Sequence, residues 1–182
     1  TQGVSSAASD VYKRQIVACS DSRADPALIF DAKPGELFVV RNVANLVPPY
    51  EPDGKLHGVS AALEFGVKVL GVKRIVVMGH AHCGGVNAMI NGAPEIVADF
   101  VGPWIAQGTP VVQHVAETVD PDQLERAAEE AIVRLSIRNL RTFPWIAERE
   151  AKGELQLSGL HFGIAEGALT ALTDKPRFEP LD

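Results

Sequence analysis

The sequence is poor in cysteine, has no excess of basic charge and contains no long apolar run. Only two cysteines, Cys19 and Cys83, occur among 182 residues, too few for a disulfide framework. Seventeen lysines and arginines against 23 aspartates and glutamates give a net charge of −6 without a basic cluster, which excludes nucleic acid as an expected partner. The longest apolar run, Ile75–Met78, is far short of the ~18 residues of a membrane span. We therefore expect no membrane association and a cytoplasmic location, and the two thiols need another explanation.

The first fifteen residues do not resemble the rest of the chain. They are small and polar, whereas periodic apolar residues are dense from Ile16 onward. Ser5–Gln15 resembles the in-frame translation of a sequencing adapter, with a natural disordered tail as the alternative. We therefore expect residues 1–15 to be a non-native or disordered leader, so that any native targeting signal is missing. Residues 16–182 are expected to form a single domain.

Short apolar runs alternate with helical patterns along that domain. This alternation predicts an α/β fold with a mainly parallel central sheet flanked by helices. The predicted strands are residues 16–18, 37–40, 74–79 and 154–162. The predicted helices are residues 26–30, 59–70, one from 86, 120–141, one from 144, and a closing helix at 165–172.

Both cysteines follow predicted strands, Cys19 after the first and Cys83 after the third, and His80 lies in the same turn as Cys83. Sites in open parallel sheets form beyond the carboxyl ends of strands. Two thiolates and one imidazole suit zinc and leave a fourth ligand position open. The helix expected after Gly84–Gly85 would favour a thiolate at Cys83. The alternative is that both thiols are merely small buried hydrophobic groups.

Asp21 and Arg23 follow Cys19 closely. A carboxylate two residues from a zinc thiolate can ligate the metal or accept a hydrogen bond from metal-bound water. Arg23 can hold that carboxylate through two parallel hydrogen bonds and keep it ionised. A surface turn with an incidental ion pair is the alternative interpretation.

From Ile16 to about Leu172 the sequence resembles beta-class carbonic anhydrases. The matching segments are Cys-Ser-Asp-Ser-Arg at 19–23, Gly-Glu-Leu-Phe-Val-Val-Arg-Asn-Val-Ala-Asn at 35–45, and Gly-His-Ala-His-Cys-Gly-Gly at 79–85. The resemblance implies a zinc-dependent catalytic domain for the reversible hydration of carbon dioxide to bicarbonate and a proton, working as a homodimer or a higher homo-oligomer. It assigns one zinc ion per chain to Cys19, His80 and Cys83, a catalytic pair to Asp21 and Arg23, and a substrate pocket to Phe38, Val43, Phe65 and Gly84.

Two other functions stay open at this point. The same metal site could hydrolyse carbonyl sulfide or carbon disulfide, or the protein could be a zinc-binding module without turnover. Some members of the family are inhibited by bicarbonate at a second site built from a Trp, an Arg and a Tyr. Arg41 matches that arginine, but Ile16 and Phe162 stand at the other two positions, so we expect no such inhibition.

The remaining polar candidates have simpler interpretations. His82 lies between two ligands because of the loop and is not expected to ligate, and His57 either starts a helix or shuttles protons. We expect surface or sheet roles for His114 and His161, and a solvated helix face for the acidic residues Glu125, Glu129 and Glu130.

Overall fold

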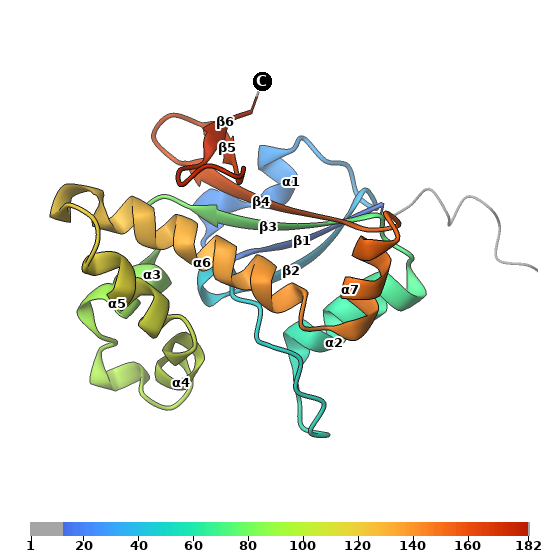
Figure 1. The fold of residues 1–182 in the computed structure, drawn as a ribbon, viewed down its shortest axis with the longest axis horizontal. Coiled ribbons are helices and arrows are strands. Elements are labelled where there is room, and N and C mark those ends of the chain that lie inside the picture. Colours follow the sequence, from blue (N-terminus) through green and yellow to red (C-terminus); the bar gives the residue numbers. More distant parts are fainter. Residues whose placement is uncertain (1–12, 182) are drawn as a thin grey trace, which may run out of the picture.

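The computed structural model describes residues 13–181 and shows one six-stranded sheet in the order β2-β1-β3-β4-β5-β6 (Figure 1). The first four strands in this order pair in parallel, and β5 and β6 continue the sheet in antiparallel pairing. The strands are β1 (Arg14–Cys19), β2 (Leu37–Asn42), β3 (Arg74–His80), β4 (Gln156–Gly163), β5 (Ala168–Ala171) and β6 (Glu179–Pro180). The expected α/β architecture with a mainly parallel sheet is confirmed.

Helices cover both faces of the sheet, and a third group lies at one end of it (Figure 1). The long helix α6 crosses one face beside α2 and α7, whereas the short helix α1 lies on the other. Helices α3, α4 and α5 gather near the carboxyl end of β3. Their bounds are α1 (Pro26–Ile29), α2 (Gly58–Glu64), α3 (Gly84–Asn91), α4 (Val101–Ala106), α5 (Thr109–Ala116), α6 (Leu124–Leu140) and α7 (Pro144–Ala151).

Three apolar clusters make up the core, and each has a separate place in the fold. Val17 and Val77 of the central strands pack against α6 and α7 on one face. Ile16, Val76 and Leu160 pack on the opposite face. A third cluster, at the carboxyl ends of β1 and β3, includes both cysteines together with residues of α3, α5 and α6. The alternation of side chains along each strand supplies the first two clusters, and the third surrounds the candidate site.

The predicted boundary between the leader and the first strand differs from the structure. Arg14 and Gln15 belong to β1 and not to the leader, and Gln15 pairs with Phe38 on β2 and with Ile75 on β3. Gln15 is fully buried, and its Nε2 donates to the carbonyl of Ala62 at 2.9 Å. Backbone pairing with both β2 and β3 therefore extends the strand two residues before the apolar pattern begins at Ile16. The assignment of residues 1–12 lies outside the described residues.

The closing helix predicted at residues 165–172 is wrong, because the segment forms the antiparallel strand β5. Gly167 turns the chain with a φ of +63°, a conformation that glycine adopts without strain. Leu169 and Ala171 then pack on the face that carries Ile16 and Val76. Apolar residues at 165, 169 and 172 fit a helical period, but 169 and 171 also fit a strand period. The segment forms a strand because it pairs with the edge of β4, which has no other partner on that side among the described residues.

None of the helices within residues 13–181 combines the length and apolar character that a membrane crossing requires.

Candidate metal centre

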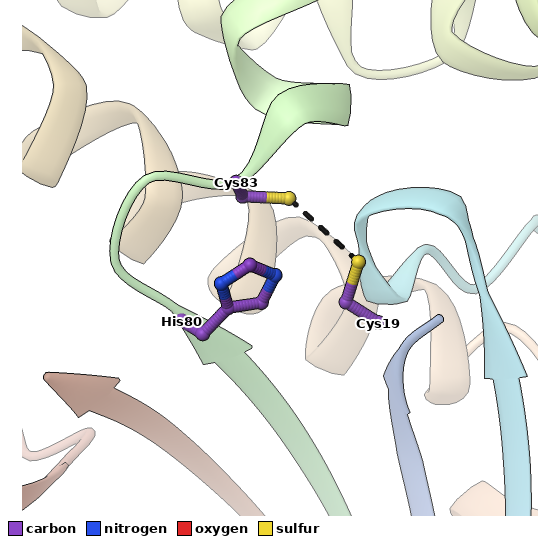
Figure 2. Close-up of side chains that lie close together, drawn as sticks. All are labelled: Cys19, His80 and Cys83. Carbon is purple, nitrogen blue, oxygen red and sulfur yellow. Dashed lines mark hydrogen bonds between the residues drawn. The ribbon is translucent and has the colours of Figure 1, made fainter. Parts of the chain in front are cut away.

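Cys19, His80 and Cys83 meet at the carboxyl ends of two neighbouring parallel strands. Cys19 is the last residue of β1, His80 is the last residue of β3, and Cys83 directly precedes α3. Their ligand atoms lie within 4.8 Å of one another, and all three residues are buried. Figure 2 shows both sulfur atoms and the imidazole ring facing the same space, with the two sulfur atoms 3.9 Å apart. Parallel pairing of β1 with β3 brings these three side chains together.

The orientation of the His80 ring fits a metal ligand. His80 Nδ1 lies 2.9 Å from the carbonyl oxygen of Ala81, so Nδ1 carries the proton and donates it to that oxygen. His80 Nε2 is buried and has no hydrogen-bond partner among the described residues. A buried polar atom without a partner is costly, and a zinc ion at this position would remove the cost.

The two thiols also suit a metal that binds thiolate. Their mutual hydrogen bond lowers the pKa of Cys19, although burial opposes the shift. The same hydrogen bond and burial raise the pKa of Cys83, whereas the backbone N–H groups of Val86 and Gly85 act in the opposite direction. These amides belong to the first turn of α3, where helix geometry points unpaired N–H groups at an anion. Zinc binds two thiolates and an imidazole readily, so these residues fit a zinc ion.

Asp21 lies next to this cluster but is not one of its members. Arg23 donates several hydrogen bonds to the Asp21 carboxylate. Its Nη2 donates to Oδ2 at 2.6 Å, and its Nε and backbone N–H donate to Oδ1 at 3.0 and 2.9 Å. These hydrogen bonds from Arg23 hold the pKa of Asp21 well below its usual range. Arg23 also donates to the carbonyl of His82 at 3.3 Å. The carboxylate of Asp21 is therefore held ionised by Arg23, which also contacts the loop between His80 and Cys83.

Arg41 on β2 holds the segment between Cys19 and Asp25. Its guanidinium donates to the carbonyl of Cys19 at 2.8 Å, to the carbonyl of Asp21 at 2.5 Å and to the Asp25 carboxylate at 2.7 Å. The Asp25 carboxylate also accepts the backbone N–H of Ala27 and so caps α1. The sequence indicates for Arg41 only a match to an anion site, whereas the structure shows three contacts of its guanidinium within the chain.

Of the four residues assigned to a substrate pocket, Val43 lines an apolar cavity that does not include the other three. Phe38 and Phe65 lie ring against ring, with their centroids 5.9 Å apart. Val43 and Trp104 both line this apolar cavity, which has a volume of about 550 Å³. The indole N–H of Trp104 donates to the carbonyl of Val43 at 2.8 Å. Neither phenylalanine borders that cavity, nor does Gly84.

His57 borders the same cavity as Val43. It directly precedes α2, and its Nε2 lies 2.6 Å from the carboxylate of Asp53. The structure therefore places His57 at a helix start, and its role as a proton shuttle stays a prediction.

The predicted solvated helix face is wrong for two of its acidic residues, whereas the predicted sheet position of His161 is confirmed by its place on β4. Glu129 and Glu130, expected on a solvated face of α6, are only 3% and 5% exposed. His161 on β4 is fully buried and lies 2.7 Å from the Glu129 carboxylate. The two glutamates lie among buried apolar positions of α6, and their place in that apolar spacing was the signal that the sequence offered. The partner of Glu129, His161 on β4, is too distant in sequence for a local pattern to reveal, whereas Glu130 pairs with Arg126 four residues earlier on α6.

We expect Gly85→Ala to destabilise the protein by ~1–3 kcal/mol, the usual cost of overpacking a core. A Cβ at Gly85 would lie 2.7 Å from Cγ1 of Val43 and 2.9 Å from Cβ of Ala44. Gly84→Ala is the matched control, because nothing lies within 4 Å of a Cβ at that position. Chemical denaturation of both variants measures the difference, and equal stabilities would contradict this packing.

Comparisons with known proteins agree with the geometry. The sequence profile of the family described as carbonic anhydrase matches residues 15–169. Beta carbonic anhydrase 3 of Arabidopsis thaliana is 36% identical over 88% of this chain and 64% of its own length. Beta carbonic anhydrase 5, chloroplastic, of the same plant is 36% identical over 83% of this chain and 51% of its own length. The chain thus spans less than two thirds of these relatives.

Solved structures of similar fold are also named as beta-carbonic anhydrases. The beta-carbonic anhydrase CcaA superposes with a TM-score of 0.86 at 29% identity, covering 94% of this chain and 85% of the other. A structure from a study of two tetrameric beta-carbonic anhydrases of the fungus Sordaria macrospora has a TM-score of 0.77 at 27% identity. That match covers 90% of this chain and 81% of the other.

Proposed function

The chain belongs to the beta-carbonic anhydrase family, and on that premise we propose that it is a lyase for the reversible hydration of carbon dioxide to bicarbonate and a proton. One observation carries this proposal above all. Three buried zinc-type ligands converge at one point, and an ionised carboxylate lies beside them without joining them. A purely structural zinc site is closed by four protein ligands, whereas a catalytic site keeps one position open.

Cys19, His80 and Cys83 would hold one zinc ion per chain. When bound, zinc lowers the pKa of a water ligand from ~15.7 to ~7 and so makes a nucleophile available at neutral pH. The chain itself orients the attacking group, because Asp21 accepts a hydrogen bond from it. Arg23 keeps the Asp21 carboxylate ionised and fixes its orientation through hydrogen bonds from the Arg23 guanidinium. A positioned acceptor of this kind is already aligned when the reaction begins.

The substrate side of the site is proposed from the family resemblance. Phe38, Val43, Phe65 and Gly84 would form apolar walls that suit a small nonpolar molecule and exclude competing water. Contact between the rings of Phe38 and Phe65 and the apolar lining around Val43 support this assignment.

The test is a stopped-flow assay of carbon dioxide hydration on zinc-loaded protein, with carbonyl sulfide and carbon disulfide as competing substrates. Carbon dioxide should be turned over, and chelation of the zinc should abolish the activity. Rapid hydrolysis of the sulfur compounds without carbon dioxide hydration would favour the hydrolase function instead. Zinc binding with no turnover of any of the three would show a zinc-binding module.

We also propose that the protein assembles as a homodimer or a larger homo-oligomer. Leu56 and Phe100 are 103% and 85% exposed, and Phe65 is 48% exposed, which is costly for large apolar side chains in a monomer. Analytical ultracentrifugation tests the assembly. The cytoplasmic location stays a prediction from the sequence, and one curated relative is named as chloroplastic.

We expect bicarbonate to cause no cooperative inhibition. The three contacts of Arg41 with Cys19, Asp21 and Asp25 leave its guanidinium engaged within the chain. Ile16 is buried among apolar residues and offers no donor to an anion. Initial rates measured against increasing bicarbonate should follow simple product inhibition, and a sigmoidal loss of activity would contradict the prediction.

A further inference from the structure

A cluster of charged and polar side chains joins α6 to strands β4 and β5, and its members Glu129, Glu130 and His161 are buried whereas Arg126 is partly exposed. Arg126 Nε lies 2.6 Å from Oε1 of Glu130, and the Arg126 Nη2 donates to the hydroxyl of Thr170 at 2.7 Å. The Arg126 Nη1 lies 2.6 Å from Nδ1 of His161. His161 Nε2 in turn lies 2.7 Å from Oε2 of Glu129. Charged groups are rarely buried in this way without a compensating set of partners.

The directions of these hydrogen bonds follow from the chemistry of the groups. An arginine can only donate, so Nδ1 of His161 accepts, and the ring proton is on Nε2. His161 therefore donates to Oε2 of Glu129. The other oxygen, Oε1, accepts the backbone N–H of Cys83 at 3.2 Å. Both oxygens of Glu129 therefore accept hydrogen bonds, Oε1 from Cys83 and Oε2 from His161.

The N–H group of Cys83 needs such a partner. Cys83 directly precedes α3, and the N–H groups at the start of a helix have no acceptor within the helix itself. The loop before it also has an uncommon backbone conformation, because His82 has a φ of +56°, in the left-handed region that residues other than glycine adopt infrequently. One anchor of the loop is the hydrogen bond from the N–H of Ala81 to the carbonyl of Phe162 at 2.9 Å. Arg23 supplies a second anchor through the carbonyl of His82, and Glu129 supplies a third through the N–H of Cys83.

We propose that Glu129 is a positioning residue for the metal centre, holding the ligand Cys83 in place through its backbone while His161 fixes the carboxylate. This inference rests on the proposed function, since it takes Cys83 as a zinc ligand. The helix α6 thereby sets the distance of the Cys83 thiolate from Cys19 and His80. When a group that hydrogen-bonds to a metal ligand is removed, metal affinity or activity typically falls by ~10–100-fold.

A glutamine at this position cannot do the same. Its single amide oxygen can take the N–H of Cys83, but its NH₂ group then faces the N–H of His161, so two donors meet. If the amide turns the other way, the N–H of Cys83 loses its acceptor. His161 cannot relieve the conflict by moving its proton, because Arg126 donates to Nδ1.

The experiment compares Glu129→Gln with the matched control Glu130→Gln in zinc-loaded protein. Both changes remove one buried carboxylate from the same turn of α6, but Glu130 contacts Arg126, whereas Glu129 contacts Cys83. Zinc release into an excess of chelator should be ~10-fold faster or more in Glu129→Gln and nearly unchanged in Glu130→Gln. In cobalt-substituted protein, the absorption band from thiolate to cobalt should shift in Glu129→Gln only.

Equal zinc release from the two variants would overturn the proposal, because the cluster would then stabilise the fold alone. Should Glu129→Gln fail to fold, Glu129→Asp keeps the charge but is one methylene shorter and cannot span both partners. It should release zinc faster than Glu130→Gln, and a rate equal to that of the unchanged protein would overturn the proposal. Neither readout depends on turnover. An unchanged protein that retains zinc but does not hydrate carbon dioxide would therefore contradict the proposed function and not this inference.

Discussion

His80→Ala should leave the protein without tightly bound zinc and without measurable hydration of carbon dioxide. The imidazole supplies one of only three ligand atoms that converge in the described part of the chain. Its loss leaves two thiolates, which hold zinc far more weakly than a complete set of ligands. Cys19→Ser and Cys83→Ser should have the same effect. Elemental analysis after dialysis against a chelator measures zinc per chain, and full zinc in any two of these variants would contradict the assignment.

His82→Asn is the matched control for this experiment. His82 lies in the same loop, but its side chain is largely exposed and pairs with Glu125 at 3.1 Å. Asparagine tolerates the left-handed backbone at this position better than most residues. The variant should therefore retain one zinc per chain. Because metal binding contributes to folding free energy, His80→Ala should also unfold at a lower temperature than His82→Asn.

Asp21→Asn should keep the zinc while the rate of hydration falls by ~10²-fold or more, the usual contribution of a positioned acid or base. The carboxylate of Asp21 is not among the converging ligands, so its loss leaves the metal ligands complete. An asparagine would turn either its oxygen or its NH₂ group towards Arg23 and could not accept at both positions that Arg23 now occupies. The orientation of the acceptor would be lost together with its charge.

Asp25→Asn provides the comparison. Asp25 also pairs with an arginine, at 2.7 Å from Arg41, and it caps α1. Asparagine still caps a helix well, so this variant should lose much less activity than Asp21→Asn. Rates from stopped-flow assays and zinc content from elemental analysis are needed for both. If Asp21→Asn loses its zinc, Asp21 is a fourth ligand and the proposed open position is wrong.

The buried cluster around Glu129 shows where sequence reasoning reaches its limit. The spacing of α6 could indicate that Glu129 and Glu130 lie on a face with apolar neighbours. It could not indicate that His161, 32 residues away, stands opposite, because that depends on which strand α6 crosses. Without a visible partner, a glutamate on a helix is most simply interpreted as solvated. The structure supplies the partner and reverses that interpretation.

By itself, the sequence predicted the α/β class, the parallel core strands, the cluster of Cys19, His80 and Cys83, and the neighbouring Asp21–Arg23 pair. These features are local: apolar periodicity defines a strand, and short spacings such as His80 to Cys83 place ligands in one turn at its end. Only the tertiary structure decided that residues 168–171 form a strand, that Arg41 is engaged within the chain and that Glu129 holds Cys83. Each of these depends on contacts between segments distant in sequence. A free strand edge, a buried donor or an unpaired N–H group acquires its partner only when the whole chain has folded.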